Sequence, residues 1–202
     1  MEKLSSMKNG SILFFISILF LSSVSENTIA RQINEVESII LEGSKLRING
    51  TSNVTDFECI YSDRISSDTL YQRVSYGDSL FISGDSITLN SANFDCGKKA
   101  INRDMQKTLK AEEFPFLEIA LKSIEIADEV PFETQLAITL AGVNRNVIVE
   151  ISEFSSSGNS ISFVGKGRVL LTNFGLTPPT ALFGLVKVDD EISISFDLTV
   201  EQ

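Results

Sequence analysis

The feature that most limits the fold is a strict alternation of apolar and polar residues near the C-terminal end of the sequence. In residues 190–200, DEISISFDLTV, every second side chain from Ile192 to Val200 is apolar. A period of two places these side chains on one face of an extended strand, whereas a helix would distribute them around its axis. The segment is therefore predicted to be a strand with one buried and one exposed face.

Strand patterns follow one another along much of the chain. They cover residues 80–94, 116–126, 134–142, 145–154 and 160–172. The third and fourth segments are separated by Val143 and Asn144, beside Gly142, which predicts a β-hairpin. Antiparallel strands with one apolar face must pair into a sandwich or close into a barrel, and about eight strands in one domain suit either. The predicted class is all-β.

One short segment has the spacing of a helix. Ile101, Met105 and Leu109 recur every four residues, and basic side chains occupy the opposite face. We expect Asn102 to be the N-cap and Asp104 to lie in the first turn. Lys107 and Lys110 suit the last turn, and Pro115 ends the helix and leads the chain into the next strand.

Residues 1–30 are predicted to be a secretory signal peptide. Two lysines precede an apolar or hydroxyl-bearing run over residues 11–24, which is too short to span a bilayer as a helix. Cleavage after Ser25 and cleavage after Ala30 both fit the small-residue pattern, and Ala30 is preferred for its alanine. An uncleaved membrane anchor is the alternative. The mature domain is then residues 31–202, in a periplasmic or secreted protein.

Composition excludes several classes of function. The chain has no histidine, so Ser-His-Asp and Cys-His nucleophile systems and His-ligated zinc sites are absent. A net charge of −10 argues against nucleic-acid binding, which depends on Lys and Arg neutralising phosphates. Cys59 and Cys96 form one disulfide or remain two buried thiols, and an exported protein favours the disulfide. We expect no enzymatic activity, no cofactor and no metal site.

Four blocks of sequence, in a characteristic order, carry a family resemblance. They are GTSNVTDFEC (50–59), INRDMQKTLKAEEFPFLEIAL (101–121), LAGVNRNVIVEI (140–151) and LTNFGLTPPTALFGLVKVDDEISISFDL (171–198). In these blocks the chain resembles the YceI-like family of exported lipid-binding proteins. The resemblance implies an antiparallel, lipocalin-like β-barrel of about eight strands, with one short helix near its opening. Members often carry a histidine where this chain has Thr55, so no role is carried over to that position.

The resemblance implies that the protein sequesters or carries a polyisoprenoid, or a similar long-chain amphiphile, inside the barrel. The alternative is an exported structural or partner-binding barrel without a bound lipid. Inward-pointing residues of the strands are expected to line the interior, although each also fits an ordinary core. They are Ile87, Leu89, Leu117, Ile119, Leu121, Leu136, Ile138, Leu140, Val149, Ile151, Phe163, Ile194 and Phe196.

The opening of the barrel is expected between the helix and a long apolar connection. Met105 and Leu109 are predicted to cover the opening and contact the lipid, and the alternative is a structural plug that only packs on the barrel wall. Residues 173–184, NFGLTPPTALFG, are more apolar than a connection requires. Their large apolar side chains are expected on the other side of the opening: Phe174, Leu176, Leu182 and Phe183.

The helix region is basic in an acidic chain. Residues 98–110 contain five basic side chains, opposed there only by Asp104. Arg103, Lys107 and Lys110 are predicted to contact an anionic headgroup or, transiently, a membrane surface. The alternative is a solvated helix face with no ligand.

Overall fold

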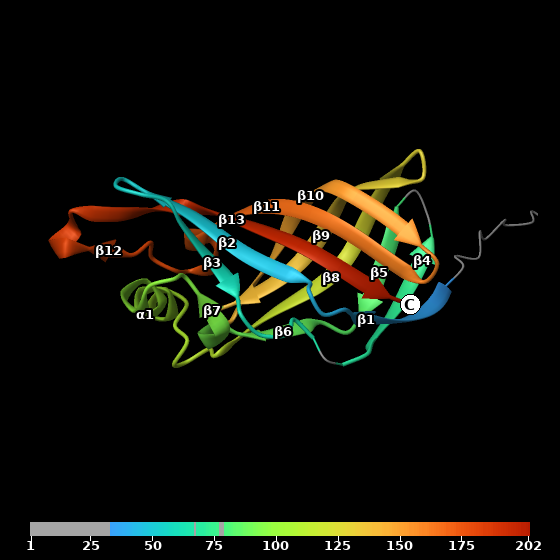
Figure 1. Ribbon diagram of the computed structural model, residues 1–202, viewed down its shortest axis with the longest axis horizontal. Helices are drawn as coiled ribbons and strands as arrows, with labels where there is room; N and C mark the ends of the chain where they lie inside the picture. The colour runs from blue at the N-terminus through green and yellow to red at the C-terminus, as the bar shows by residue number, and fades with distance from the viewer. Residues whose placement is uncertain (1–32, 67, 77–78) are drawn as a thin grey trace, which may run out of the picture. The chain divides into compact units, whose positions relative to one another are not determined.

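The alternating segment near the C-terminus belongs to β13 (Val186–Glu201), which pairs with neighbours on both edges (Figure 1). One edge pairs antiparallel with β11 (Ser160–Leu170). The other edge pairs first with β2 (Lys45–Ser52) and then, near its C-terminal end, with β1 (Ile33–Ile40). This strand therefore joins two different sets of partners.

The protein is described here from a computed structural model that covers residues 33–66, 68–76 and 79–202. The predicted signal peptide, residues 1–30, lies outside the described residues. Within these ranges, no helix has the length and apolar character needed to cross a membrane. The remaining elements are β3 (Phe57–Tyr61), β4 (Leu70–Tyr76), β5 (Leu80–Gly84), β6 (Ile87–Asn90), η1 (Ser91–Asn93), β7 (Phe94–Asp95), α1 (Lys99–Thr108), β8 (Phe116–Ala127), β9 (Val130–Leu140), β10 (Val143–Ser157), η2 (Leu171–Phe174), β12 (Thr180–Ala181) and η3 (Leu182–Gly184).

Eight strands of the described chain close into a ring. Their order is β1-β4-β5-β8-β9-β10-β11-β13, and β13 pairs back to β1 through Ile39 with Glu201 and Ile40 with Val200. All of these pairings are antiparallel. The predicted antiparallel β-barrel with one short helix is therefore confirmed. The barrel core includes Leu89 and Val149, which are fully buried.

At the end of the barrel near α1, the strands are paired differently from those in the eight-stranded ring. There β2, β3 and β7 continue the sheet beyond β13, and β6 takes the place of β5 beside β8. Among the residues described, no strand pairing joins β6 to β7 or β3. The backbone N–H of Asn90 donates to the Tyr61 hydroxyl across this gap, at 3.3 Å. The helix α1 follows directly after β7 and lies at this end (Figure 1).

The hairpin between β9 and β10 turns two residues earlier than predicted. Val143 pairs with Leu140, so the two turn residues are Ala141 and Gly142, and Val143 and Asn144 belong to β10. Ala141 and Gly142 have φ of 48° and 76°. A two-residue hairpin of this kind needs positive φ at both positions, and glycine adopts it without strain. The prediction of a hairpin was right, and its placement at Val143 and Asn144 was wrong.

The helix begins four residues before the predicted start. Its N-cap is Lys98, whose side chain makes no capping hydrogen bond, so the prediction of Asn102 as N-cap was wrong. Asp104 consequently lies beyond the first turn, which contains no acidic residue. Lys107 lies in the last turn as predicted, whereas Lys110 follows the helix with φ of 53°.

Asn102 instead anchors the start of the helix to the strand before it. Its Oδ1 accepts from the Cys96 backbone N–H at 2.7 Å, and its Nδ2 donates to Asp95 Oδ1 at 3.0 Å. The Gly97 backbone N–H also donates to that carboxylate, at 2.9 Å. These two donors stabilise the ionised form and lower the pKa of Asp95, the bond from Asn102 contributing most. The Asn102 side chain therefore bonds to the segment that precedes the helix instead of capping the helix. An asparagine can do either, so the residue type alone does not show which role it has.

Candidate functional site

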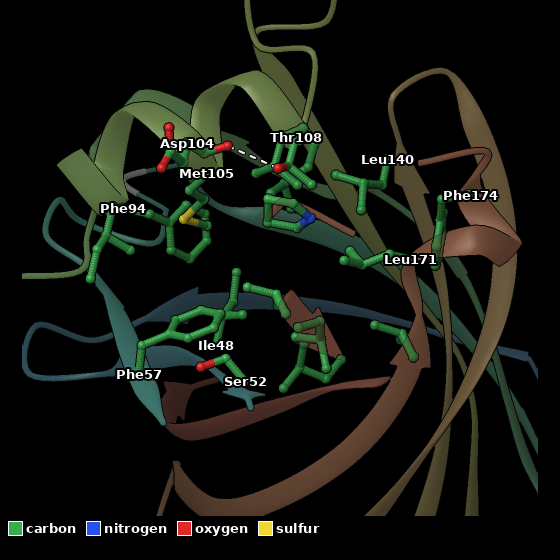
Figure 2. Close-up of a pocket in the computed structure, with 18 of the residues that line it drawn as sticks. Ile48, Ser52, Phe57, Phe94, Asp104, Met105, Thr108, Leu140, Leu171 and Phe174 are labelled. Carbon is green, nitrogen blue, oxygen red and sulfur yellow. Dashed lines mark hydrogen bonds between the residues drawn. The ribbon is translucent and has the colours of Figure 1, made fainter. Parts of the chain in front are cut away.

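An apolar cavity lies at the α1 end of the barrel (Figure 2). Its walls come from the strands β2, β3, β7, β8, β9, β11 and β13, from α1, from η2, and from the connection between η2 and β13. The empty volume is about 1400 Å³, counting the space open to solvent at its mouth. The lining is almost entirely aliphatic and aromatic, and a cavity of this kind is typical of a site for an apolar ligand.

Many of the residues predicted from sequence meet in this cavity. Those from the barrel strands, from α1 and from η2 are Leu117, Ile119, Ile138, Leu140, Ile194, Met105, Leu109 and Phe174. Periodicity identified the inward face of each strand and of the helix, and Phe174 was predicted from the apolar content of its connection. Phe174, Leu140, Met105 and Leu171 surround the space from several sides in Figure 2.

The other strand residues expected to line the interior do not line the cavity. Leu89, Leu136, Val149 and Phe196 are buried core, and Ile87, Leu121 and Phe163 pack against that core. Ile151 is half-buried, at an irregularity of the β10–β11 pairing, and Phe163 and Phe196 meet edge to face with ring centres 5.6 Å apart. A Cβ at Gly165 would lie 2.6 Å from the Phe196 ring, so this glycine makes room for it. The barrel is filled by its own side chains toward the ring and hollow toward α1.

The apolar connection after η2 contributes differently from the prediction. Phe174 lines the cavity, and Leu176 is buried but does not line it. Leu182 and Phe183 point away from the cavity into solvent, with exposures of 67% and 110%. Both residues therefore lie outside the cavity lining, in a tight turn where both have positive φ, and the expected contact of Phe183 with a ligand inside the cavity has no counterpart in the lining.

Several cavity residues were not identified from the sequence. Leu46 and Ile48 on β2 and Phe57 on β3 form the wall opposite α1, and Val188 and Ile192 extend the wall along β13. The alternation of Leu46 and Ile48 with Arg47 was a usable signal, but it spans only one repeat. Ile192 alternates with Ile194 and belonged to the strand pattern already recognised.

The helix α1 separates its two faces sharply. Ile101, Met105 and Leu109 line the cavity, so α1 forms part of its wall instead of packing outside the barrel. Arg103 and Lys107 are exposed, as is Lys110 just after the helix, and none of the three lines the cavity. The basic side chains are therefore available to solvent beside the opening.

A few polar side chains form the rim of the cavity, and we call them the polar rim. They are Ser52, Thr55, Asp104, Thr108 and Thr180. Thr108 Oγ1 donates to the backbone carbonyl of Asp104 at 2.8 Å, and Ser52 Oγ donates to the Thr55 carbonyl at 2.6 Å. Within the described ranges, Asp104 is the one ionisable side chain in the lining.

A disulfide joins β3 to the segment that leads into α1. Cys59 and Cys96 are bonded and both are buried. The Cys96 sulfur lies 3.4 Å from Met105 Sδ on the cavity side of the helix. The disulfide and the Asn102–Asp95 contacts together fix the N-terminal end of α1 against the barrel. In the part of the chain that the structure describes, no cluster of three or more His, Cys, Asp or Glu side chains forms a metal site.

Comparison with known proteins identifies the family. A family model described as the YceI-like domain matches residues 72–200. No curated protein matches the sequence. A similar solved structure is BcnA of Burkholderia cenocepacia, with a TM-score of 0.56 and 18% identity, covering 77% of this chain and 95% of that one. Another is a polyisoprenoid binding domain from Saccharophagus degradans implicated in plant cell wall breakdown, with a TM-score of 0.52 and 11% identity, covering 83% and 99%. These structures share the fold, and because the family model matches more than half of the chain, the protein belongs to the YceI-like family.

Proposed function

We propose that the protein binds a long-chain lipid, such as a polyisoprenoid, in the cavity and sequesters or carries it outside the cytoplasm. The observation that carries the proposal is the apolar cavity, whose walls are shared between the barrel and α1. The Saccharophagus degradans structure, described as a polyisoprenoid binding domain, supports the choice of ligand class. The apolar run of residues 11–24 supports export.

The lining supplies the driving force for this binding. Each methylene transferred from water into an apolar site contributes about 0.8 kcal/mol, so ten contribute about 8 kcal/mol before the cost of ordering the ligand. The polar rim leaves hydrogen-bonding groups at the mouth for the polar end of the molecule. The ligand therefore enters with its chain toward the filled part of the barrel and its polar end beside α1.

The proposed activity is binding, without chemical conversion. A histidine-free chain with this lining offers aliphatic contacts and hydroxyl groups but no activated nucleophile. We expect a bound lipid to be recovered unchanged after prolonged incubation with the pure protein. Turnover of that lipid would contradict this part of the proposal.

The test is to identify what the protein carries. Protein purified from cells that express the full chain is extracted with organic solvent, and the extract is analysed by mass spectrometry. We expect a long-chain isoprenoid or related amphiphile at close to one molecule per protein. The variant Ile194→Trp fills the cavity and should lose most of this lipid, because Ile194 lines it.

The matched control is Ile148→Trp, since Ile148 lies on the outer face of β10 with 54% exposure. This variant should retain the lipid. A wild-type protein that is repeatedly empty, or an Ile194→Trp variant that carries as much lipid as the control, would contradict lipid binding in the cavity. Either result would favour an exported structural or partner-binding barrel.

A further inference from the structure

We propose that the mouth of the cavity docks on an anionic membrane surface, through an apolar tip on one side and a basic helix face on the other. The apolar tip consists of Val54, Leu182, Phe183 and Leu185. The basic face consists of the side chains that α1 and its flanking residues turn to solvent: Lys98, Lys99, Arg103, Lys107 and Lys110. This inference concerns how the mouth meets a membrane and does not depend on which molecule fills the cavity.

The apolar tip is a compact exposed surface made by two loops. Leu182, Phe183 and Leu185 have exposures of 67%, 110% and 73%, and Val54 has 67%. Asn53 ties the loops together, because its Nδ2 donates to the Leu185 carbonyl at 2.9 Å and its Oδ1 accepts from the Lys187 backbone N–H at 2.7 Å. Large apolar side chains gathered in this way favour burial against another apolar phase.

The backbone holds these side chains outward despite unfavourable geometry. Leu182, Phe183 and Gly184 have φ of 49°, 58° and 87°, three consecutive residues in the left-handed region. Glycine and asparagine are the residues that ordinarily occupy such positions, and a leucine followed by a phenylalanine is strained there. If this turn served only to connect β12 to β13, glycine or asparagine would form it with less strain than Leu182 and Phe183. The geometry therefore points to a function for the exposed pair.

The basic face lies across the mouth from the tip. The cavity is lined by Ile101 and Met105 on the inner side of α1, and by Pro179 and Ala181 in the segment that leads into the tip. The two surfaces therefore flank the same opening, and α1 and β12 lie at the same end of the barrel (Figure 1). Because Asp104 is the one acidic residue in 98–110, the segment has a local charge of +4 in a chain of −10.

This combination selects an anionic bilayer as the partner. Basic side chains are attracted to anionic lipid headgroups, and aromatic and aliphatic side chains enter the boundary between headgroups and acyl chains. The basic residues line the outside of the mouth and not the cavity, so their charge acts on the surface that the mouth faces. Docking would place the mouth against the bilayer, and a lipid chain would pass between the two apolar regions without crossing water.

The experiment measures partition onto vesicles. Protein purified from cells that express the full chain is mixed with vesicles of phosphatidylcholine alone or with added phosphatidylglycerol, at low and high salt. We expect stronger binding to the vesicles that contain phosphatidylglycerol, and a loss of this preference at high salt, because exposed charges are screened over about 8 Å at physiological ionic strength.

Two sets of variants separate the contributions. Changing Arg103, Lys107 and Lys110 to glutamate should lower partition onto the anionic vesicles by about tenfold or more. The matched control changes Lys45, Lys122 and Lys166 to glutamate, three exposed residues of the barrel wall that do not line the cavity. The control alters the net charge equally and should partition nearly as the wild type does.

The tip is tested with Leu182→Asn and Phe183→Asn together, since asparagine tolerates the positive φ at both positions. This variant should lose binding to both kinds of vesicle, whereas Phe132→Thr with Ile148→Thr, on exposed strand positions, should not. Circular dichroism and thermal melting of every variant verify that the barrel is folded.

Three results would overturn the proposal. They are wild-type protein that does not bind the anionic vesicles, a glutamate variant that binds as well as its control, and self-association through the tip without vesicle binding. Failure of the lipid-binding proposal is a separate result, because it is read from the organic extract and not from vesicle partition.

Discussion

Asp104 places a negative charge at the mouth of an otherwise apolar cavity. Asp104 belongs to the polar rim, and its backbone carbonyl accepts the hydrogen bond from Thr108. A half-buried carboxylate repels an anionic group more strongly than it would in water, because the effective dielectric constant there is lower. For the proposed lipid ligand, we expect a polar end that meets Asp104 inside the rim to be an alcohol or carbonyl, whereas the basic side chains act outside the mouth.

This selectivity predicts the behaviour of Asp104→Asn. The substitution removes the charge, so the affinity for a phosphate-ended long-chain lipid should rise about fivefold relative to the matching alcohol, corresponding to about 1 kcal/mol. Competition between the two lipids for the purified protein measures this ratio. The control is Asp128→Asn, in the exposed turn between β8 and β9. Position 128 has a positive φ, which aspartate and asparagine both adopt. An unchanged ratio in Asp104→Asn would mean that the carboxylate does not meet the polar end of the ligand.

At the scale of elements, α1 is attached to the barrel by a disulfide and hydrogen bonds near its N-terminal end. The Cys59–Cys96 disulfide and the Asn102–Asp95 pair both lie there, whereas Leu109 at the other end is held by packing. The helix therefore has one fixed end and one end held by apolar contacts. We therefore expect contacts of Met105 and Leu109 with a bound ligand to help position the helix.

The disulfide gives a testable estimate of this attachment. The bonded cysteines are separated by 37 residues in sequence, and closing a loop of this length contributes about 3–4 kcal/mol in the chain-entropy model. Cys59→Ser with Cys96→Ser should therefore lower the free energy of unfolding by about 3 kcal/mol, measured by urea denaturation. Thiol titration of the denatured, unreduced wild type should detect no free thiol. Two titratable thiols would show that the bond does not form.

The sequence predicted some elements better than others, for physical reasons. β8, β11 and β13 were found because long alternating runs leave no other regular structure. β1 to β4 were missed because their alternation of apolar and polar residues is short, as in Leu46, Arg47 and Ile48 of β2. The predicted start of α1 was wrong because Asn102 was taken as an N-cap. Its side chain bonds to the segment before the helix, and an asparagine can form either interaction.

At the scale of the whole molecule, the sequence predicted a barrel but not how far its interior is filled. A period of two identifies the inward face of a strand, but it carries no information about depth along the barrel axis. Phe196 and Ile194 follow the same alternation, yet Phe196 fills the barrel against Gly165 and Ile194 borders the cavity. The difference depends on neighbours from other strands, which only the folded arrangement brings together.

A partly hollow barrel should be stabilised by its ligand. Removing the bound lipid should lower the melting temperature, because a ligand at one hundred times its dissociation constant contributes about 2.7 kcal/mol to folding. For a domain of this size that corresponds to a shift of about 5–10 °C. Differential scanning calorimetry before and after delipidation measures the shift, and adding the lipid back should restore it. Ile194→Trp should melt at the same temperature with or without lipid, and a wild type insensitive to delipidation would contradict stabilisation through the cavity.

The gap between β6 and β7 has a consequence for the range of ligands that the protein accommodates. In the closed ring, a wider bore would require breaking backbone ladder hydrogen bonds between neighbouring strands. At the α1 end, η1 connects β6 to β7 along the chain, and moving β6 away from β3 would displace side-chain contacts and the Asn90–Tyr61 hydrogen bond while the ladders on either side stay intact. We therefore expect the girth of the hollow end to adjust more readily than that of the closed ring, so that one barrel accepts chains of different thickness, straight or branched.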